Sequence, residues 1–216
     1  MPCVCLDTYV QAVRSGAIAA LPTDTVWGLA VAPHHSPGLY TLKQRSLDKS
    51  LILMGANAAA LWPYVAMDAA QWQTITDSHW PGQLTLVVPT SPAVPLAMHP
   101  HTPDTVGVRV PDHPVARQVL ALTGPLATTS ANLSGQPTLT SVEQVLEQFP
   151  KVYGLDNSAI QALLGQATGH KIDMPVPSGL PSTVARWQSN NWEVLRQGSV
   201  HLQSIDNEDN FRGNYF

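Results

Sequence analysis

Positive charge is scarce in this chain. Of 216 residues only 11 are Lys or Arg, against 15 Asp or Glu, and no Lys or Arg lies from Ser50 to Val108. The formal net charge of -4 and the pI of about 6.0 argue against a protein that mainly grips long stretches of nucleic acid through phosphates. Because cations are so few, the cluster of Lys43, Arg45 and Lys49 indicates a local patch that attracts anions. Taken alone, the cluster also suits a helix end, where it would complement the helix dipole.

Cysteine is nearly absent as well. Cys3 and Cys5 are the two cysteines of the chain, and they lie too close together for an ordinary loop-closing disulfide. They also lack the second Cys pair of a structural zinc site, so we expect both to be reduced and structural. The eight His residues are scattered. The sequence therefore predicts no protein metal site.

The sequence contains no apolar run of about 18 residues and no charged-then-apolar leader. We therefore expect no membrane span, no signal peptide and a cytoplasmic location. A hydrophobic fraction of 44% with 12% charged residues is typical of a compact folded protein, and the length suits one main domain. We expect that domain over residues 1–203, followed by a flexible polar and acidic tail over residues 204–216.

Helix and strand patterns alternate along most of the chain, which predicts an α/β fold. Caps predict helices after Asp7, Ser36, Asn57, Asp68 and His113, and Ser141 with Gln144 resembles a capping box. The predicted strands cover 17–21, 51–54, 84–88, 106–110 and 125–129, with a hairpin of 182–188 and 192–196 around a turn at 189–191. We expect one twisted sheet that mixes parallel and antiparallel pairs and is flanked by helices.

Three separated segments are rich in hydroxyls, cations and flexible backbone. They span residues 21–28 (Leu-Pro-Thr-Asp-Thr-Val-Trp-Gly), 43–51 with its cationic cluster, and 128–135 (Thr-Thr-Ser-Ala-Asn-Leu-Ser-Gly). The first follows a predicted buried strand, and α/β proteins usually hold their ligands at the ends of such strands. Together the three segments have the groups needed to hold a nucleotide.

The order of motifs resembles the YrdC family, the threonylcarbamoyl-adenylate synthases, from about residue 10 to residue 200. The motifs are Pro-Thr-Asp-Thr-Val-Trp-Gly-Leu from 22, Lys-x-Arg from 43 with Lys-Ser-Leu-Ile from 49, Trp-Pro-Gly-Gln-Leu-Thr-Leu from 80, Val-Arg-Val-Pro from 108, Ser-Ala-Asn-Leu-Ser-Gly from 130, Pro-Ser-Thr-Val from 181 and Leu-Arg-Gln-Gly from 195.

The resemblance implies a nucleotidyltransferase with a single YrdC-like domain. Such an enzyme combines L-threonine, bicarbonate and ATP into threonylcarbamoyl-AMP and releases pyrophosphate. ATP is a substrate that we expect to arrive with Mg²⁺. The product feeds the formation of N6-threonylcarbamoyladenosine in tRNA (t6A37), so the implied partner is a downstream tRNA threonylcarbamoyltransferase machinery, with at most weak contact to RNA and none to a membrane.

The resemblance also assigns site residues by position. Lys43 and Arg45 are the implied catalytic cations. The nucleotide side is implied to comprise Arg45, Lys49, Thr105, Ser130, Asn132, Thr138 and Arg196. Threonine is implied to contact Thr25, Arg109, Thr128 and Ser182. The simpler alternatives are that the hydroxyls of Thr105, Thr128 and Thr138 bond their own backbone, and that Arg109 belongs to a structural ion pair.

Three positions depart from the family pattern. Met54 stands where many relatives have His, which removes one polar group from the implied threonine pocket. Gln83 and Gln197 replace prolines in loops, where we expect the change to be tolerated.

Two other functions compete with this hypothesis. The first is a carbamoyl-transferring domain that handles carbamoyl-adenylate, which normally sits beside zinc-finger and acylphosphatase portions. The second is an RNA-binding or ribosome-maturation factor, which the net charge and the lack of a basic and aromatic stripe disfavour.

Overall fold

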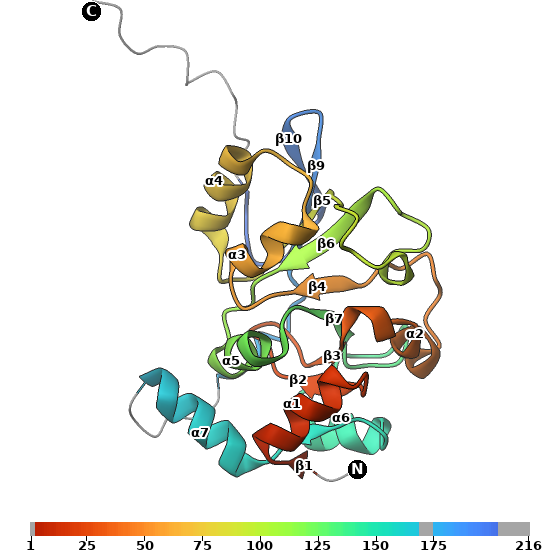
Figure 1. The fold of residues 1–216 in the computed structure, drawn as a ribbon, viewed down its shortest axis with the longest axis vertical. Coiled ribbons are helices and arrows are strands. Elements are labelled where there is room, and N and C mark those ends of the chain that lie inside the picture. The colour runs from red at the N-terminus through yellow and green to blue at the C-terminus, as the bar shows by residue number, and fades with distance from the viewer. Residues whose placement is uncertain (1–2, 169–174, 203–216) are drawn as a thin grey trace, which may run out of the picture.

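The computed structural model describes residues 3–168 and 175–202, and for residues 166–168 the backbone alone. Within these residues the main sheet has eight strands, and a two-stranded sheet lies beside it (Figure 1). The α/β fold predicted from the sequence is therefore confirmed. The strands are β1 (Cys3–Val4), β2 (Ala19–Leu21), β3 (Gly28–Val31), β4 (Ile52–Met54), β5 (Leu84–Pro89), β6 (Thr105–Arg109), β7 (Leu126–Ser130), β8 (Gly154–Leu155), β9 (Thr183–Gln188) and β10 (Asn191–Arg196).

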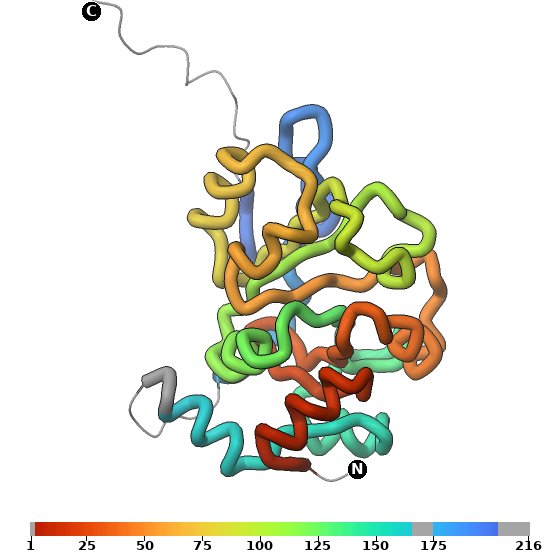
Figure 2. Tube along the Cα trace, in the orientation of Figure 1, coloured from red at the N-terminus to blue at the C-terminus, as the bar shows by residue number. Residues whose placement is uncertain are grey.

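The main sheet is mixed, as predicted. Its order is β10-β9-β5-β6-β4-β7-β3-β2, and of the seven pairings in the described chain, β5 with β9 and β4 with β6 are parallel. The small sheet joins β1 to β8 in parallel, so the start of the chain runs beside the segment that precedes the last helix (Figure 2). The carboxyl ends of the parallel pair β4 and β6 meet at Met54 and Arg109.

Seven α-helices in the described residues cover the two faces of the sheet. They are α1 (Leu6–Arg14), α2 (Pro37–Lys43), α3 (Ala58–Leu61), α4 (Ala69–His79), α5 (Pro114–Thr123), α6 (Val142–Gln148) and α7 (Asn157–Thr168). Short 3-10 turns lie at η1 (Pro33–His35), η2 (Trp62–Tyr64) and η3 (Leu96–Met98).

Two apolar clusters follow the alternation of side chains along the strands. In β3, Leu29 and Val31 join the cluster with α2, α3, α4 and α6, whereas Ala30 joins the cluster with α1, α5 and α7. Side chains alternate in the same way along β4, where Leu53 belongs to the first cluster and Met54 to the second. Each central strand is therefore buried on one face by one group of helices, while its other face turns toward α1, α5 and α7.

Most predicted helix starts are confirmed by a side-chain cap. Asn57 accepts from the Ala60 amide at 2.9 Å, and Asp68 accepts from the Ala70 amide at 2.9 Å. His113 caps α5 through Nδ1, which accepts from the Ala116 amide at 3.4 Å. Each of these bonds satisfies a backbone amide that the first helical turn leaves without a partner.

One predicted cap is wrong, and two others are right only in part. Helix α1 begins at Leu6 with Cys5 at the cap position, so Asp7 lies inside the first turn. Ser36 makes no side-chain cap bond at the start of α2. Ser141 caps α6, but the Gln144 side chain accepts from Thr140 instead of completing the capping box.

The hairpin is confirmed with a shorter turn than predicted. Asn191 pairs with Gln188 and belongs to β10, so the turn contains Ser189 and Asn190. These two residues have φ of 52° and 59°, the left-handed conformation of the two-residue turns that match strand twist. Four of the strands and helices were not predicted at all, namely β1, β3, β8 and α7.

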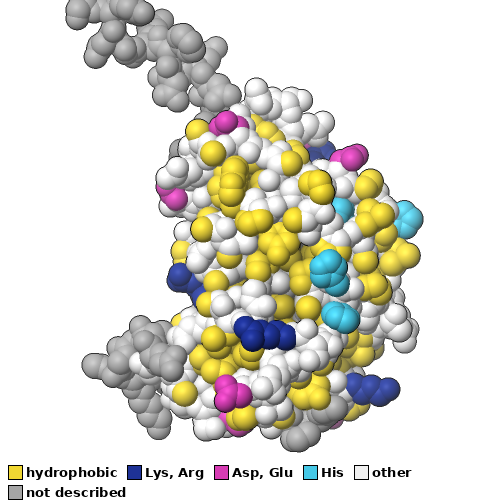
Figure 3. Space-filling model, viewed as in Figure 1, with side chains coloured by type: hydrophobic (Ala, Val, Ile, Leu, Met, Phe, Trp, Pro, Cys, Tyr) yellow, Lys and Arg dark blue, Asp and Glu magenta, His cyan; other side chains and the backbone are white. Residues whose placement is uncertain are grey.

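No helix in the described part of the chain is long and apolar enough to cross a membrane. Cys3 and Cys5 are free thiols, as expected. The described residues also hold no group of three or more His, Cys, Asp or Glu arranged for a metal. The few Lys and Arg side chains visible in Figure 3 lie scattered over that face. The predicted tail over 204–216 lies outside the described residues.

Candidate active site

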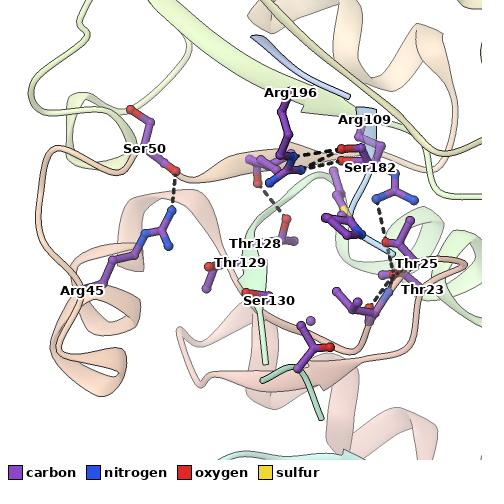
Figure 4. Close-up of a pocket in the computed structure, with 16 residues that line it drawn as sticks. Thr23, Thr25, Arg45, Ser50, Arg109, Thr128, Thr129, Ser130, Ser182 and Arg196 are labelled. Atoms are coloured by element: carbon purple, nitrogen blue, oxygen red, sulfur yellow. Dashed lines mark hydrogen bonds between the residues drawn. The ribbon is translucent and has the colours of Figure 1, made fainter. Parts of the chain in front are cut away.

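A hollow of about 240 Å³ opens on the face of the sheet that carries Ile52 and Met54 (Figure 4). Ile52 is in register with Thr128 and Met54 with Arg109, so these side chains share one face. Loop 22–27 and the residues just before β9 close the sides. The lining residues are Thr23, Thr25, Val26, Gly28, Arg45, Ser50, Ile52, Met54, Arg109, Thr128, Thr129, Ser130, Thr138, Pro181, Ser182 and Arg196.

Arg109 anchors one wall of the hollow. It lies at the end of β6 with 2% of its surface exposed, and its Nη2 forms an ion pair with Asp24 Oδ1 at 2.7 Å. Its Nε donates to the Gly82 carbonyl at 3.0 Å and its Nη1 to Thr25 Oγ1 at 2.9 Å. Burial lowers the pKa of Arg109, and the Asp24 carboxylate opposes that shift.

The Arg109 guanidinium keeps part of its hydrogen-bonding capacity. A guanidinium has five N–H groups, one on Nε and two on each terminal nitrogen. Three are used in the bonds to Gly82, Thr25 and Asp24, which leaves one N–H on each terminal nitrogen. Arg109 lines the hollow, so these two N–H groups are the ones that a ligand there could use. The structural ion pair and the ligand-binding role are thus compatible.

The Thr23-Asp24-Thr25 loop presents a fixed hydroxyl to the hollow. Thr23 Oγ1 donates its proton to the Val26 carbonyl at 2.6 Å. Thr23 Oγ1 also accepts from the backbone amides of Thr25 and Val26 at 3.2 Å each, and it lies 3.0 Å from Thr25 Oγ1. Thr25 Oγ1 accepts from Arg109 Nη1, which holds this hydroxyl in place at the wall of the hollow.

Arg196 and Ser182 form the upper wall in Figure 4. Arg196 donates to the Ser182 carbonyl from Nε at 3.1 Å and from Nη2 at 2.9 Å. Nη2 also lies 3.3 Å from Ser182 Oγ, which in turn lies 2.8 Å from the hydroxyl of buried Thr85 on β5. Burial lowers the pKa of Arg196, which remains a cation at neutral pH.

Arg45 lies across the hollow from Arg109, as Figure 4 shows. Its Nε donates to the Lys49 carbonyl at 2.9 Å and its Nη2 to the Ser50 carbonyl at 3.0 Å. These bonds hold the guanidinium against the loop that joins α2 to β4. Burial lowers the pKa of Arg45. The second wall therefore also offers a cation with unused N–H groups.

Lys43 lies behind the hollow and is 2% exposed. Its Nζ donates to Thr129 Oγ1 at 3.1 Å, to the carbonyl and hydroxyl of Ser130, and to Asn132 Oδ1 at 3.4 Å. Burial, together with the nearby charges of Arg45 and Lys49, lowers its pKa to about 8. In this structure Lys43 fixes the loop that follows β7.

The structure brings together eight of the twelve residues implied by the family resemblance. Thr25, Arg45, Arg109, Thr128, Ser130, Thr138, Ser182 and Arg196 line the hollow. The other four do not line it. Lys43 and Asn132 meet behind it, Lys49 is exposed and bonds Arg45 through its backbone, and Thr105 is half-buried at the start of β6. Thr128 also bonds backbone, since its hydroxyl donates to the Ile52 carbonyl at 3.0 Å.

Seven lining residues were not predicted, and an eighth, Met54, was expected at the implied threonine pocket without a contact of its own. Thr23, Val26, Gly28, Thr129 and Pro181 stand inside or beside motifs that the sequence analysis quoted, so their adjacency was a usable signal. Ile52 and Met54 alternate along β4, and the period of two indicates that they share a face. Ser50 also stands inside a quoted motif, Lys-Ser-Leu-Ile from 49, although its place in the hollow depends on the loop after α2.

The structure shows the surroundings of the three residues that depart from the family pattern. Met54 lines the hollow where many relatives have His. Gln83 Nε2 donates to the Asp24 carbonyl at 3.1 Å, and its Oε1 accepts from the Ser199 hydroxyl. Gln197 donates to the carbonyls of Gly198 and Val200. Both glutamines thus form bonds that a proline could not, which is consistent with their tolerance.

The fold and the hollow define an α/β protein with a hydroxyl-lined site between opposed guanidinium groups, suited to a small ligand bearing several anionic oxygens. Comparison with known proteins narrows this class. The profile of the Sua5/YciO/YrdC family, described as "Telomere recombination", matches residues 11–198. The chain therefore belongs to this family.

Several curated relatives cover most of the chain. The threonylcarbamoyl-AMP synthase of Vibrio cholerae is 35% identical over 199 residues, which cover 89% of this chain and 97% of the relative. The Yersinia enterocolitica threonylcarbamoyl-AMP synthase is 41% identical over 158 residues, 67% of this chain and 78% of the relative.

Solved structures share the fold. P. abyssi Sua5 complexed with L-threonine superposes with a TM-score of 0.74 at 29% identity, over 89% of this chain. The chain spans about half of that protein, 54% of its length. E. coli YciO superposes with a TM-score of 0.70 at 21% identity, over 90% of this chain and 89% of YciO, a likeness of fold alone.

Proposed function

We propose that the hollow is the active site in which this chain acts as a threonylcarbamoyl-AMP synthase, joining L-threonine, bicarbonate and ATP for the t6A modification of tRNA. The activity is that of relatives 35% to 41% identical over most of the chain, and it makes the protein a nucleotidyltransferase. The observation that supports the site is the placement of two guanidinium groups, Arg45 and Arg109, on opposite walls of one hollow.

Arg109 and Ser182 suit the amino acid. The two free N–H groups of Arg109 match the two oxygens of the threonine carboxylate, and Ser182 lies on the adjoining wall. Thr25 faces the same end with a hydroxyl that Arg109 holds in place, which suits a polar group of the substrate. Thr128 lies on β7 beside them and completes this side of the site.

Arg45 suits the phosphates, with Ser130, Thr138 and Arg196 on the nucleotide side. Lys43 and Asn132 support this side indirectly by holding the end of β7, where Ser130 lies. Lys49 is exposed at the rim and Thr105 lies outside the hollow, so both remain proposals from the resemblance. ATP enters as a substrate, and we place the accompanying Mg²⁺ on its phosphate oxygens.

The reaction needs positioning and charge stabilisation. The threonine nitrogen first attacks bicarbonate, water leaves, and the resulting carbamate attacks the α-phosphorus of ATP. A bond forms from the carbamate oxygen to phosphorus as the bond to the β-phosphate oxygen breaks, and pyrophosphate leaves. Negative charge collects on the phosphate oxygens during this step, where fixed guanidinium N–H groups stabilise it. Holding both reactants in one hollow supplies the remaining acceleration.

The product is a reactive mixed anhydride. Its threonylcarbamoyl group must be passed to tRNA by an acceptor enzyme, so we propose a downstream tRNA threonylcarbamoyltransferase machinery as the partner. Direct contact of this chain with RNA would be weak, because its net charge is negative.

A pyrophosphate-release assay tests this function. We expect ATP turnover that requires both L-threonine and bicarbonate. The variant Arg45→Ala should lose most of this turnover while keeping the melting temperature. Arg186→Ala is the matched control, because Arg186 is an exposed arginine paired with Glu193 outside the hollow. RNA binding without threonine-stimulated turnover would instead support the RNA-binding alternative, and wild-type rates in Arg45→Ala would remove Arg45 from the site.

A further inference from the structure

A buried hydroxyl behind the hollow has no role in the site described so far. Thr85 lies on the central strand β5, is 1% exposed and does not line the hollow. Its Oγ1 lies 2.8 Å from Ser182 Oγ, which does line the hollow. Buried hydroxyls in proteins are normally satisfied, so the direction of this hydrogen bond carries information.

Counting protons sets that direction. A hydroxyl has one proton to donate and two lone pairs to accept with. Among the described residues, the Thr85 hydroxyl forms its hydrogen bond with Ser182 Oγ. If Ser182 were the donor, the Thr85 proton would be buried without an acceptor, which costs about 1–3 kcal/mol. The satisfied arrangement has Thr85 donating to Ser182.

Arg196 uses the other lone pair of Ser182. Its Nη2 lies 3.3 Å from Ser182 Oγ and can act there as a donor only. With Thr85 and Arg196 both donating, Ser182 Oγ has no acceptor capacity left. Its own O–H then points into the hollow, where it meets an oxygen of a ligand.

We infer that Thr85 is a positioning residue that fixes the Ser182 hydroxyl as a hydrogen-bond donor to the carboxylate of the amino acid substrate. This inference rests on the proposed function. It places a donating Ser182 hydroxyl in the same hollow as the Arg109 guanidinium. A carboxylate can only accept, so the Ser182 donor and the Arg109 guanidinium together favour the carboxylate end of the amino acid on this wall.

The test replaces Thr85 with valine, which keeps nearly the same shape and removes the hydroxyl. The Thr85 methyl packs toward Gly107 on β6, a contact that valine retains. Without the bond donated by Thr85, the Ser182 hydroxyl is free to rotate, and its O–H no longer points only toward the ligand. Its hydrogen bond to the ligand therefore weakens. We expect Thr85→Val to raise KM for L-threonine about tenfold, the effect of losing one hydrogen bond to a charged group. KM for ATP and kcat should stay within about twofold of wild type.

Two further variants separate positioning from structure. Thr85→Ser restores the hydroxyl and should restore KM for threonine to near the wild-type value. In an Ser182→Ala background, Thr85→Val should add little to KM for threonine, because the group through which Thr85 acts is gone. A full additional tenfold effect in that background would overturn the inference.

The outcomes distinguish this inference from the proposed function. If wild type turns over ATP with threonine and Thr85→Val has an unchanged KM for threonine, the inference is wrong while the function stands. If wild type shows no threonine-dependent turnover, the function itself fails. Should Thr85→Val not fold, Thr85→Ser and Thr85→Ala supply the comparison, and equal KM values for threonine in these two variants would overturn the role of the hydroxyl.

Discussion

The ion pair between Arg109 and Asp24 gives the sharpest prediction about stability. The two side chains are 3% and 10% exposed, and Asp24 Oδ2 has no hydrogen-bond partner in the described structure. Replacing Arg109 with methionine would leave a buried carboxylate without its counter-charge. Removing one partner of a buried pair costs about 3–5 kcal/mol in the free energy of unfolding. For a domain of this size, that lowers the melting temperature by about 6–20 °C.

A double variant checks the physical reason. Asp24→Asn combined with Arg109→Met removes both charges, so we expect it to be more stable than Arg109→Met alone by at least about 1 kcal/mol. Urea denaturation measures both free energies, and the unchanged slope of each transition confirms that the same unfolding is compared. A loss below 1 kcal/mol in Arg109→Met, or strict additivity of the two single variants, would refute the reasoning. Threonine binding should be lost in both, because the fork is gone.

Two further predictions concern a buried lysine and a close backbone approach. The pKa of Lys43 falls from 10.5 to about 8 on folding. Between these pH values the unfolded chain binds more protons than the folded protein, so the free energy of unfolding rises with pH. Urea midpoints at pH 8 and 9.5 should show this rise in wild type and its loss in Lys43→Met. An added Cβ at Gly198 would lie 2.5 Å from both the Pro181 carbonyl oxygen and the Thr183 nitrogen. Gly198→Ala should therefore lower the free energy of unfolding by about 1–3 kcal/mol. The control is Gly165→Ala in α7, where a Cβ meets open space, and it should leave the melting temperature unchanged or raise it.

Local signals explain what the sequence predicted well. Asp68 and Asn57 cap helices through bonds to amides two or three residues away, which depend little on the rest of the fold. The strand at 84–88 is rich in β-branched residues, and it forms the core of β5. The motif residues Thr25, Arg109 and Ser182 converge because each stands at the end or beginning of a sheet strand or in the loop beside it.

Long-range pairings explain what the sequence did not predict. β3 begins at Gly28, inside a polar motif, and its strand conformation depends on antiparallel partners on both sides, β2 and β7. Helix α7 packs on α5, and this tertiary contact is not visible in the hydrophobic periodicity of the sequence. The bond from Lys43 to the loop after β7 joins residues 86 or more positions apart. A motif pattern could place Lys43 near this loop but could not tell whether its ammonium faces the hollow or the space behind it.

The central claim is that one hollow holds both the amino acid and the nucleotide. A crystal structure of the protein with L-threonine and a non-hydrolysable ATP analogue tests this claim most directly. We expect the threonine carboxylate within hydrogen-bonding distance of Arg109 and Ser182, and the phosphates against Arg45, with the amino acid nitrogen between them. Either ligand bound outside this hollow, or threonine with its carboxylate turned away from Arg109, would contradict the account.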